Sequence, residues 1–563
     1  MVETDQLYHI VHEAVERFAI MEFDGSRNEI NHVKVREWLK RNYPNKNQKI
    51  KQMNPLLLTD GYKTGHHQQY PKGTTLVYSN FTPRSNRYAP KGCDQVVSFG
   101  QQMVMQQLHE TFERDFFSRP KSEVCGEMKR ELSLYLSTDY NTSHFEALHD
   151  LGYLPIHVKA LPEGSLVPIK VPVLTIYNTH PDFYWVTNYL ETILSNLLWK
   201  PMTSATIAHQ YRKVLTKWME KTDAERAWFI DWQGHDFSMR GMDSAEAVIS
   251  SGLAHLTSFS GTDGLPAIYG ARKFYGETGF VGGSVNATEH SVMCAGTKDD
   301  EIETFRNLMN TYPTGILSIV SDTWDLWKVC TEHVVTLKDE ILARDGKLVI
   351  RPDSGDPVDI LCGKGIYQPG DRLLTNEEID EDVYAPEFKG VIELLWDVFG
   401  GTVNAQGYKV LDPHIGAIYG DSITIERADE ICKRLAAKGF ASTNVVLGIG
   451  SFTYQYNTRD TFGFAMKATY VEIQNQKLSG VSTEGREIFK DPITDDGTKK
   501  SATGLLRVET DTDGNYKLFD KVSWAFENSG SLQTIYCNGK FENTTTLTKI
   551  RESLKNILTP QLT

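Results

Sequence analysis

Short apolar stretches in the middle of the chain each run directly into carboxylates, an arginine or glycines. These residues are Asp322 after GILSIVS, Arg351 and Asp353 after LVI, Gly420 and Asp421 after HIGAIY, and Gly450 and Ser451 after VVLGI. Glycines let backbone N–H groups approach a phosphate closely. Carboxylates hold sugar hydroxyls or ligate Mg²⁺ through water, and an arginine stacks on a flat ring or binds a phosphate. Together these residue types predict a site for a phosphorylated sugar.

Two further stretches add an aromatic ring, a second arginine and a histidine. HDFSMRG holds Phe237 and Arg240, and EHS holds His290. An aromatic face and a guanidinium plane can sandwich a planar heterocycle, although a core phenylalanine beside a surface arginine has the same spacing. A neutral imidazole can accept a phosphoryl group, although a single histidine is more often structural. We expect no metal site at His290, because no second histidine stands at zinc-ligand spacing from it. The metal ligands are left unassigned.

The elements that must position these residues alternate between strand and helix. Between about residues 200 and 450, strands such as GILSIV and TNVVLGIG alternate with helical stretches such as ADEICKRLAAKG. This pattern predicts βαβ units and a parallel sheet, closed or open, with ligands at the carboxyl ends of its strands. One aspartate after a strand is often a helix cap. Four successive strands that all end in polar or glycine residues are hard to explain by capping alone.

The composition narrows the class of protein. The formal net charge is −14 over 563 residues, which argues against a surface that coats nucleic acid. The seven cysteines are scattered without a C-x-x-C pair, so we expect neither a disulfide framework nor a zinc cluster, and a reducing cytosol suits them. We expect no membrane span, because no run of about eighteen apolar residues occurs. The acidic N-terminus lacks the apolar core of a secretory signal, so we expect a cytoplasmic protein.

From about residue 53 to 550, the chain resembles the nicotinamide phosphoribosyltransferases, within the type II phosphoribosyltransferases. The resemblance is carried by many stretches in one order. They are TDGYK, YWVTNYLETIL, HDFSMRG, SGLAHLTSFSGTD, SVNATEHS, VSDTWD, IRPDSGDP, YGDSI, TRDTFGFAMKATY and IFKDP. The turn GIGSF, which the resemblance assigns to phosphate binding, is less glycine-rich than in some members of the family. Ala465 stands where a hydroxyl residue can occur. Both departures concern details of phosphate binding rather than the reaction.

The resemblance implies an α/β fold of the type II phosphoribosyltransferase kind. An irregular α/β barrel domain is expected over residues 196–452. An α+β domain is expected to be built from N- and C-terminal segments, residues 53–195 and 453–563. Residues 1–52 have no counterpart in the resemblance. Apolar residues between Leu7 and Phe18 recur there at helical spacing, which predicts an N-terminal helical extension.

The resemblance also implies an activity. Nicotinamide and 5-phosphoribosyl 1-pyrophosphate would give nicotinamide mononucleotide and pyrophosphate with Mg²⁺, a step of NAD salvage. ATP hydrolysis would be coupled to this reaction through phosphorylation of His290. The basic residues of the site would come from the neighbouring chain, so a homodimer with shared active sites is expected.

The resemblance assigns roles to individual residues. Phe237 and the partner-derived Tyr62 would stack on the two faces of the pyridine ring. Asp263 of GTD would read the carboxamide, and Arg240 and Arg351 would line the ring and phosphate pocket. Asp353 would face the ribose, with Asp322 near His290. Gly420 and Asp421 would contact the ribose, and Gly450 and Ser451 would bind the phosphate. Arg84, Arg459 and Lys467 would reach the phosphates from the neighbouring chain.

Three alternative functions remain to be compared with this one. A nicotinate phosphoribosyltransferase shares the fold and the chemistry, but Asp263 would repel the carboxylate of nicotinate at a cost of several kcal/mol. A non-catalytic relative is disfavoured because His290, Asp322, Arg351 and Asp353 are all present. A barrel glycosidase that uses the carboxylates would not explain the glycine turns and the basic residues.

Overall fold

The computed structural model describes residues 53–364, 385–420, 422–477, 480–490 and 502–558, and the backbone of residues 367–368 and 372–373. The chain separates into two compact units, Met1–Leu57 and Leu58–Thr563. The predicted N-terminal extension lies outside the described residues. Two seven-stranded sheets lie in the second unit. The finer domain boundaries at residues 195/196 and 452/453 stay a prediction.

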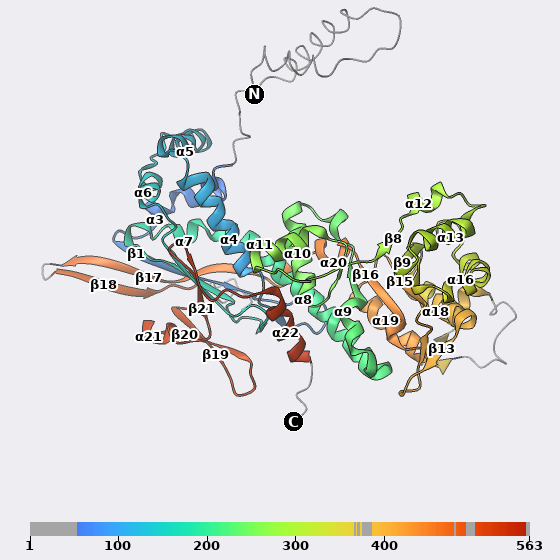
Figure 1. The fold of residues 1–563 in the computed structure, drawn as a ribbon. Coiled ribbons are helices and arrows are strands. Elements are labelled where there is room, and N and C mark those ends of the chain that lie inside the picture. The colour runs from blue at the N-terminus through green and yellow to red at the C-terminus, as the bar shows by residue number, and fades with distance from the viewer. Residues whose placement is uncertain are drawn as a thin grey trace, which may run out of the picture. The chain divides into compact units, whose positions relative to one another are not determined.

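A curled parallel sheet carries the strand ends that the sequence singled out (Figure 1). Its strand order is β7-β6-β16-β15-β10-β9-β8, and every pairing is parallel. A parallel bridge between Gly261 and Gly283 links β7, the first strand in this order, to the segment that precedes β8, the last strand. The strands are β6 (Gly234–Asp236), β7 (Gly261–Thr262), β8 (Asn286–Ala287), β9 (Thr314–Val320), β10 (Asp345–Arg351), β15 (Ile415–Tyr419) and β16 (Val445–Ile449).

Helices follow the strands of this sheet and share its hydrophobic core. In α19 (Ile425–Ala437) the buried residues recur at helical spacing, and the Thr424 side chain caps the first turn by accepting from the Arg427 backbone N–H at 3.2 Å. Other helices of this region include α8 (Glu191–Thr222), α10 (Ala245–Leu256), α11 (Leu265–Tyr275), α12 (His290–Ala295), α13 (Glu301–Thr311), α17 (Pro357–Cys362), α18 (Pro386–Phe399) and α20 (Ser451–Gln455). The mixed α/β fold with a parallel sheet is therefore as predicted.

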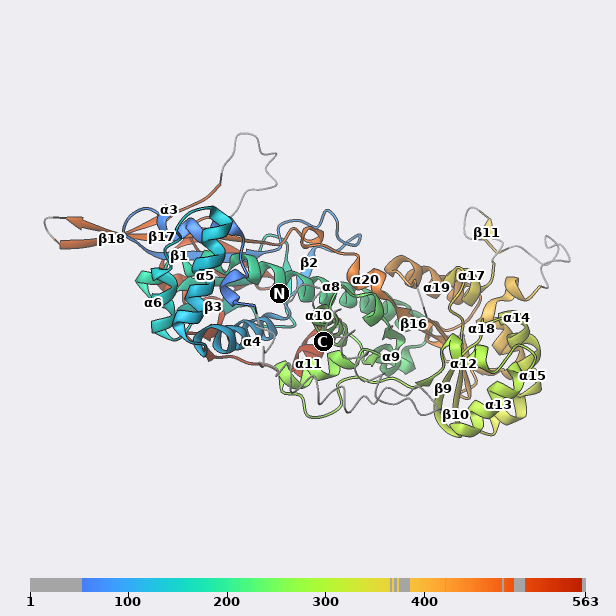
Figure 2. The same ribbon diagram turned by 90° about the horizontal axis from the view of Figure 1, so that it is seen from above.

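The second sheet is antiparallel and is built from both ends of the chain. Its order is β18-β17-β1-β5-β3-β21-β22, so that β17 pairs with β1 and β21 pairs with β3. Figure 2 shows the helices α4, α5 and α6 beside it. The strands are β1 (Thr74–Thr82), β3 (Ile156–Ala160), β5 (Leu174–Asn178), β17 (Ala465–Lys477), β18 (Gly480–Glu487), β21 (Gln533–Cys537) and β22 (Lys540–Phe541), and the helices are α4 (Gln101–Phe112), α5 (Lys121–Leu136), α6 (Ser143–Leu151) and α22 (Leu547–Leu558).

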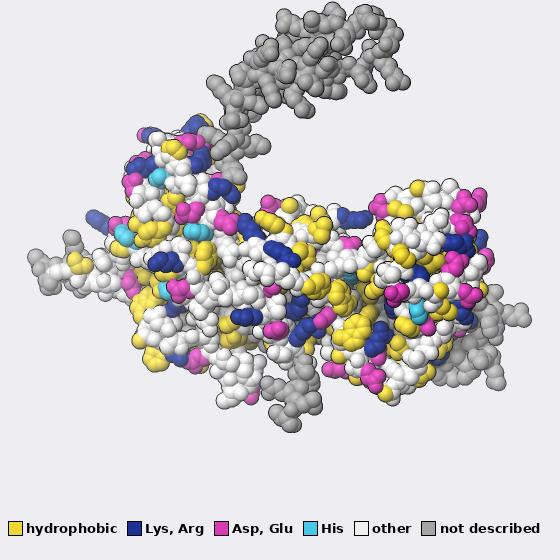
Figure 3. All heavy atoms as spheres, in the orientation of Figure 1, with side chains coloured by type: hydrophobic (Ala, Val, Ile, Leu, Met, Phe, Trp, Pro, Cys, Tyr) yellow, Lys and Arg dark blue, Asp and Glu magenta, His cyan; other side chains and the backbone are white. Residues whose placement is uncertain are grey.

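Short two-stranded ladders complete the described fold. They are β2 (Gln95–Val97) with β4 (Leu166–Pro168), β13 (Gly401–Val403) with β14 (Lys409–Leu411), β19 (Leu505–Thr510) with β20 (Tyr516–Val522), and β11 (Tyr367–Gln368) with β12 (Arg372–Leu373). No helix in the described part of the chain is long and apolar enough to cross a membrane. On the face drawn in Figure 3, basic and acidic side chains are interspersed.

A buried ion pair ties the C-terminal part of the antiparallel sheet to its N-terminal strands. Lys159 Nζ of β3 lies 2.6 Å from Glu527 Oε2 at the end of α21 (Trp524–Glu527), and both side chains are almost fully buried. Tyr78 of β1 donates its hydroxyl to the other oxygen of Glu527 at 3.1 Å. Lys159 also donates to Asn528 Oδ1 at 2.8 Å. Breaking such a pair leaves a charge in the protein interior, where it is poorly solvated.

We therefore expect Glu527→Ala to lower the stability of this sheet by about 3–5 kcal/mol, because Lys159 loses its buried counter-charge. The measurement is urea unfolding followed by circular dichroism. Asp150→Ala is the control, since Asp150 pairs with Lys121 on the exposed surface and its loss should change the urea midpoint far less. Equal midpoints for the two variants would contradict the expectation.

Candidate active site

The carboxyl ends of the parallel strands bring the predicted residues to one edge of the curled sheet. Because neighbouring strands run in the same direction, the residues that leave them emerge side by side. Asp322 follows β9, Arg351 ends β10 with Asp353 two residues beyond, and Gly420 follows β15. Phe237 follows β6, and its backbone N–H donates to Ile449 of β16 at 3.0 Å. Asp421 lies outside the described residues.

Phe237, Asp263 and Arg351 lie together in the lining of one cavity, and this part of the lining is called the ring slot below. The Arg351 guanidinium carbon lies 4.9 Å from the centroid of the Phe237 ring, in cation–π geometry. The sandwich of a ligand between Phe237 and Arg240 stays a prediction. Arg240 is exposed on the turn Met239–Gly241. The Nε of Arg351 is buried and has no hydrogen-bond partner among the described residues.

Asp263 lies in this slot at the end of β7. His235 Nε2 lies 2.9 Å from its Oδ1, and the Ser284 hydroxyl donates to the same oxygen. Burial raises the pKa of Asp263, but the hydrogen bonds from His235 and Ser284 and the charge of Arg351 outweigh it, so the pKa lies below its usual value. Asp263 is therefore ionised at neutral pH, and its side chain remains partly accessible, at 42% exposure.

Asp322 connects the strand ends to His290. Its Oδ2 accepts the backbone N–H groups of Asp353 at 2.8 Å and Ser354 at 2.7 Å. Its Oδ1 lies 3.7 Å from His290 Nε2 at the start of α12. The Asp322 carboxylate is buried, whereas the His290 side chain is 45% exposed. An exposed imidazole next to a fixed carboxylate can accept a group from solution while the carboxylate orients its ring.

Glycines at the strand ends leave room that a side chain would fill. A Cβ at Gly420 would lie 2.5 Å from Asp353 Oδ1 and 3.0 Å from Arg351 Nε, so a side chain there would displace these two groups. Gly450 precedes the short helix that begins at Ser451. A Cβ on Gly241 would collide with the Ser451 side chain, so the turn carrying Arg240 packs against this segment. Arg240 is thus placed next to the Gly450–Ser451 turn.

A basic group, defined as Lys63, Arg84, Arg459 and Lys467, lies with the antiparallel sheet instead. Lys63 and Lys467 both pair with Glu191, at 2.7 and 3.8 Å. Burial lowers the pKa of Lys467, and the charges of Arg84, Lys63 and Arg459 lower it further, although Glu191 opposes them. Such crowding of cations favours the binding of an anion. Lys63 and Glu191 were not predicted from the sequence.

Within one chain, Tyr62 lies beside Lys63 of this basic group. It lies on the turn Gly61–Gly65, is 66% exposed, and has Lys63 Nζ at 5.3 Å from its ring centroid. Arg84 and Lys467 lie beside or within the paired strands β1 and β17 of the antiparallel sheet, whereas Phe237, Asp322 and Arg351 stand at strand ends of the parallel sheet. One chain therefore presents the predicted site residues as two separate sets.

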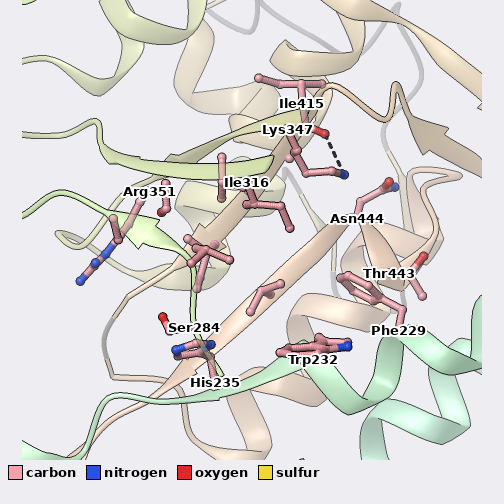
Figure 4. Close-up of a pocket in the computed structure, with 18 of the residues that line it drawn as sticks. Phe229, Trp232, His235, Ser284, Ile316, Lys347, Arg351, Ile415, Thr443 and Asn444 are labelled. Carbon is pink, nitrogen blue, oxygen red and sulfur yellow. Dashed lines mark hydrogen bonds between the residues drawn. The ribbon is translucent and has the colours of Figure 1, made fainter. Parts of the chain in front are cut away.

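The ring slot is part of a cavity of about 320 Å³ inside the curled sheet. Figure 4 shows His235, Ser284 and Arg351 toward one end, and Lys347, Thr443 and Asn444 toward the other. Between them the lining is mainly apolar, with Trp232, Ile316 and Phe229 among its residues. Its size and polarity are those of a small-molecule site.

His235 and Ser284 are the residues of this slot that the sequence analysis missed. A signal for His235 was present: side chains alternate along a strand, so His235 shares a face with Phe237. The two rings do pack together, with centroids 4.6 Å apart. Ser284 carried no comparable signal, since it lies in a loop before β8 and meets Asp263 only through the fold.

No group of three or more histidine, cysteine or acidic side chains is placed to hold a metal ion in the described part of the chain. Asp322 and Asp353 are neighbours at the strand ends. Two carboxylates suit Mg²⁺ that arrives with substrate phosphates and keeps several waters, because that ion seldom uses a cage made only of protein ligands.

Comparisons with known proteins show what the chain is similar to. The model of the nicotinate phosphoribosyltransferase (NAPRTase) family matches residues 232–554, and the model of the nicotinamide phosphoribosyltransferase N-terminal domain matches residues 54–121. A nicotinamide phosphoribosyltransferase of Acinetobacter baylyi is 51% identical over 89% of this chain and 97% of its own length. Proteins of the same name from Xanthomonas campestris and Mycoplasma pneumoniae are 32% and 33% identical over 88% and 80% of this chain and 97% and 94% of their own lengths. The chain therefore belongs to the nicotinate phosphoribosyltransferase family and is a phosphoribosyltransferase with the N-terminal domain of the nicotinamide enzymes.

Proposed function

We propose that this enzyme transfers the phosphoribosyl group of 5-phosphoribosyl 1-pyrophosphate to nicotinamide, giving nicotinamide mononucleotide and pyrophosphate in NAD salvage. The observation that carries the proposal is the slot in which Arg351 lies over Phe237 with the Asp263 carboxylate beside it. A flat heterocycle with a hydrogen-bond donor on its rim matches that slot. The names of the relatives support the same substrate.

Asp263 supports the amide over the acid as substrate. An ionised carboxylate accepts a hydrogen bond from the NH₂ of a carboxamide, but it repels the carboxylate of nicotinate across a partly desolvated pocket. The lowered pKa of Asp263 keeps this charge in place at neutral pH. Nicotinate remains the alternative substrate, because the matching family model carries its name.

The charges around the slot follow those that develop during the transfer. As the bond to pyrophosphate weakens, positive charge grows on the ribose and negative charge on the leaving group. Asp353 lies at the strand end where the ribose would sit, and Asp322 fixes its backbone. Mg²⁺ would supply further charge neutralisation to the pyrophosphate, and Asp322 and Asp353 would be the carboxylates that hold it. Gly420 leaves room for the sugar, and Gly450 stands directly before the short helix α20.

His290 is proposed to couple ATP hydrolysis to this reaction. The side chain is exposed enough to receive the terminal phosphoryl group of ATP, and Asp322 lies 3.7 Å from its Nε2. In the transfer, the bond between the β–γ bridging oxygen and the γ-phosphorus breaks as a bond from the imidazole nitrogen forms, leaving ADP. The Asp322 charge stabilises the ring in the orientation for that attack.

A homodimer is proposed because one chain divides the site residues into two sets. The strand ends supply the ring slot and the carboxylates, whereas Tyr62 and the basic group lie with the antiparallel sheet. A second copy in a two-fold arrangement would bring its Tyr62 over the open face of the slot and its basic group to the phosphates. Each active site would then contain residues of both chains.

Asp263→Asn should reverse the choice of substrate, because it removes the charge and keeps the size. We expect kcat/KM for nicotinamide to fall about tenfold and kcat/KM for nicotinate to rise about tenfold. The measurement is mononucleotide formation from each substrate with phosphoribosyl pyrophosphate and Mg²⁺. The surface variant Asp150→Asn serves as the control. An unchanged ratio of the two kcat/KM values would show that Asp263 does not select the substrate.

His290→Ala should abolish the effect of ATP, because no imidazole remains to accept the phosphoryl group. We expect the ratio of the rates with and without ATP to fall to about one, and acid-labile label from γ-³²P-ATP to disappear. His149→Ala is a matched control on α6, where the His149 ring bonds the Arg119 carbonyl at 2.8 Å. Persistent ATP stimulation in His290→Ala would refute the assigned role.

Mixing two inactive variants should restore activity if the sites are shared. We expect Asp353→Ala and Arg459→Ala to be nearly inactive alone. Coexpressed in equal amounts, they should recover about a quarter of the wild-type rate, because half of the dimers would contain one intact site. The assay uses the purified coexpressed protein. No recovery in a verified mixed dimer would place both residues in the same chain's site.

A further inference from the structure

We propose that His235 is a positioning residue that fixes the Asp263 carboxylate, together with Ser284, so that a single oxygen faces the substrate amide. The inference rests on the proposed function, because it concerns how the same slot selects nicotinamide. It adds two residues, neither of which has a role in the reaction assigned above.

The imidazole of His235 is itself held in one place. Its side chain is 9% exposed. The Phe237 ring lies 4.6 Å from it, tilted by 34°. Gly261 lies against it from the next strand, since a Cβ there would come within 2.7 Å of His235 Nδ1. With contacts from both neighbours, the ring has little freedom to turn away from Asp263.

Both donors meet the same oxygen of Asp263. His235 Nε2 lies 2.9 Å from Oδ1, and because an ionised carboxylate only accepts hydrogen bonds, Nε2 carries the proton. The Ser284 hydroxyl also donates to Oδ1. In the described part of the chain, the side-chain hydrogen bonds that Asp263 accepts all end on this oxygen. Oδ2 is therefore left for a ligand.

This arrangement has a chemical consequence for selection. A carboxylate that is free to rotate presents both oxygens in many directions, and its ligand must stop that motion on binding. Two donors on Oδ1 remove most of the freedom beforehand and stabilise the negative charge. The amide NH₂ of nicotinamide then meets an oriented acceptor. Nicotinate gains nothing from the orientation, because its own carboxylate has no proton to donate.

The structure also allows His235 a simpler role, as a filler that supports the Phe237 ring. Two substitutions separate the roles. His235→Phe keeps an aromatic ring against Phe237 and removes the donor. His235→Gln loses the ring but places its Nε2 at a reach similar to that of the histidine Nε2. A positioning role predicts that Gln functions better than Phe, and a packing role predicts the reverse.

The experiment measures kcat and KM of the full-length enzyme for nicotinamide and for nicotinate, with saturating phosphoribosyl pyrophosphate and Mg²⁺. We expect His235→Phe and Ser284→Ala each to raise KM for nicotinamide about tenfold, as expected for losing a hydrogen bond to a charged group. The kcat for nicotinamide and kcat/KM for nicotinate should change less than about threefold. His235→Gln should stay within about threefold of wild type in all of these values.

His414→Phe is the matched control. His414 Nδ1 bonds Asp412 Oδ1 at 2.8 Å, so the variant removes another histidine–aspartate hydrogen bond, just before β15 and away from the strand ends. We expect it to leave the ratio of kcat/KM for the two substrates unchanged. If it lowers that ratio as His235→Phe does, the inference is overturned, because the effect would not be specific to Asp263.

The decisive comparison repeats His235→Phe and Ser284→Ala in an Asp263→Ala background. A positioning role has nothing left to position there, so neither substitution should raise KM for nicotinamide further. Effects that persist in that background overturn the inference, as does an unchanged KM in both single variants. If the wild-type enzyme forms mononucleotide from nicotinamide, the proposed function stands even when this inference is overturned. Wild-type enzyme that forms none from nicotinamide overturns both.

Discussion

One carboxylate oxygen, Oδ2 of Asp322, holds the ends of two neighbouring strands in register. By accepting the backbone N–H groups of Asp353 and Ser354, it ties the end of β9 to the turn after β10. Such charge-assisted bonds in a buried place are stronger than neutral ones and resist rotation of the turn. Arg351 ends β10 just before that turn, Asp353 lies within it, and Gly420 packs against both. Asp322 therefore helps to position Arg351 in the ring slot, Asp353 on the ribose side and the His290 ring.

The same strand ends place charges of both signs within a short distance, and this serves a reaction in which charge separates. An isolated buried carboxylate would take up a proton or distort the fold. Here Asp263 stays ionised because His235, Ser284 and Arg351 stabilise its negative form. Arg351 in turn covers the Phe237 ring. Substrate recognition and charge balance thus depend on the same small set of contacts.

Much of this could be predicted from the sequence. Alternating strands and helices indicated the parallel sheet, and the topology of such a sheet then placed Asp322, Arg351, Asp353 and Gly420 at one edge. The contacts between side chains were harder to predict from the sequence. The sequence indicated Phe237 and Arg240 as a sandwich around a ligand, which stays a prediction, but it gave no signal for the contact of Phe237 with Arg351 from another strand. The Ser284 contact likewise depends on loop geometry, and sequence spacing carries no information about it.

The antiparallel sheet that mixes both ends of the chain affects the order in which the protein can form during synthesis. Asn80 of β1 bonds Lys467 of β17 across 387 residues. At a translation rate of roughly 5–20 residues per second, β1 waits about 20–80 s for its neighbour. During that time one of its edges has unpaired backbone groups, which are prone to join other chains. The curled parallel sheet is complete at Ile449, before β17 begins, so it can fold on the ribosome while the antiparallel sheet must wait.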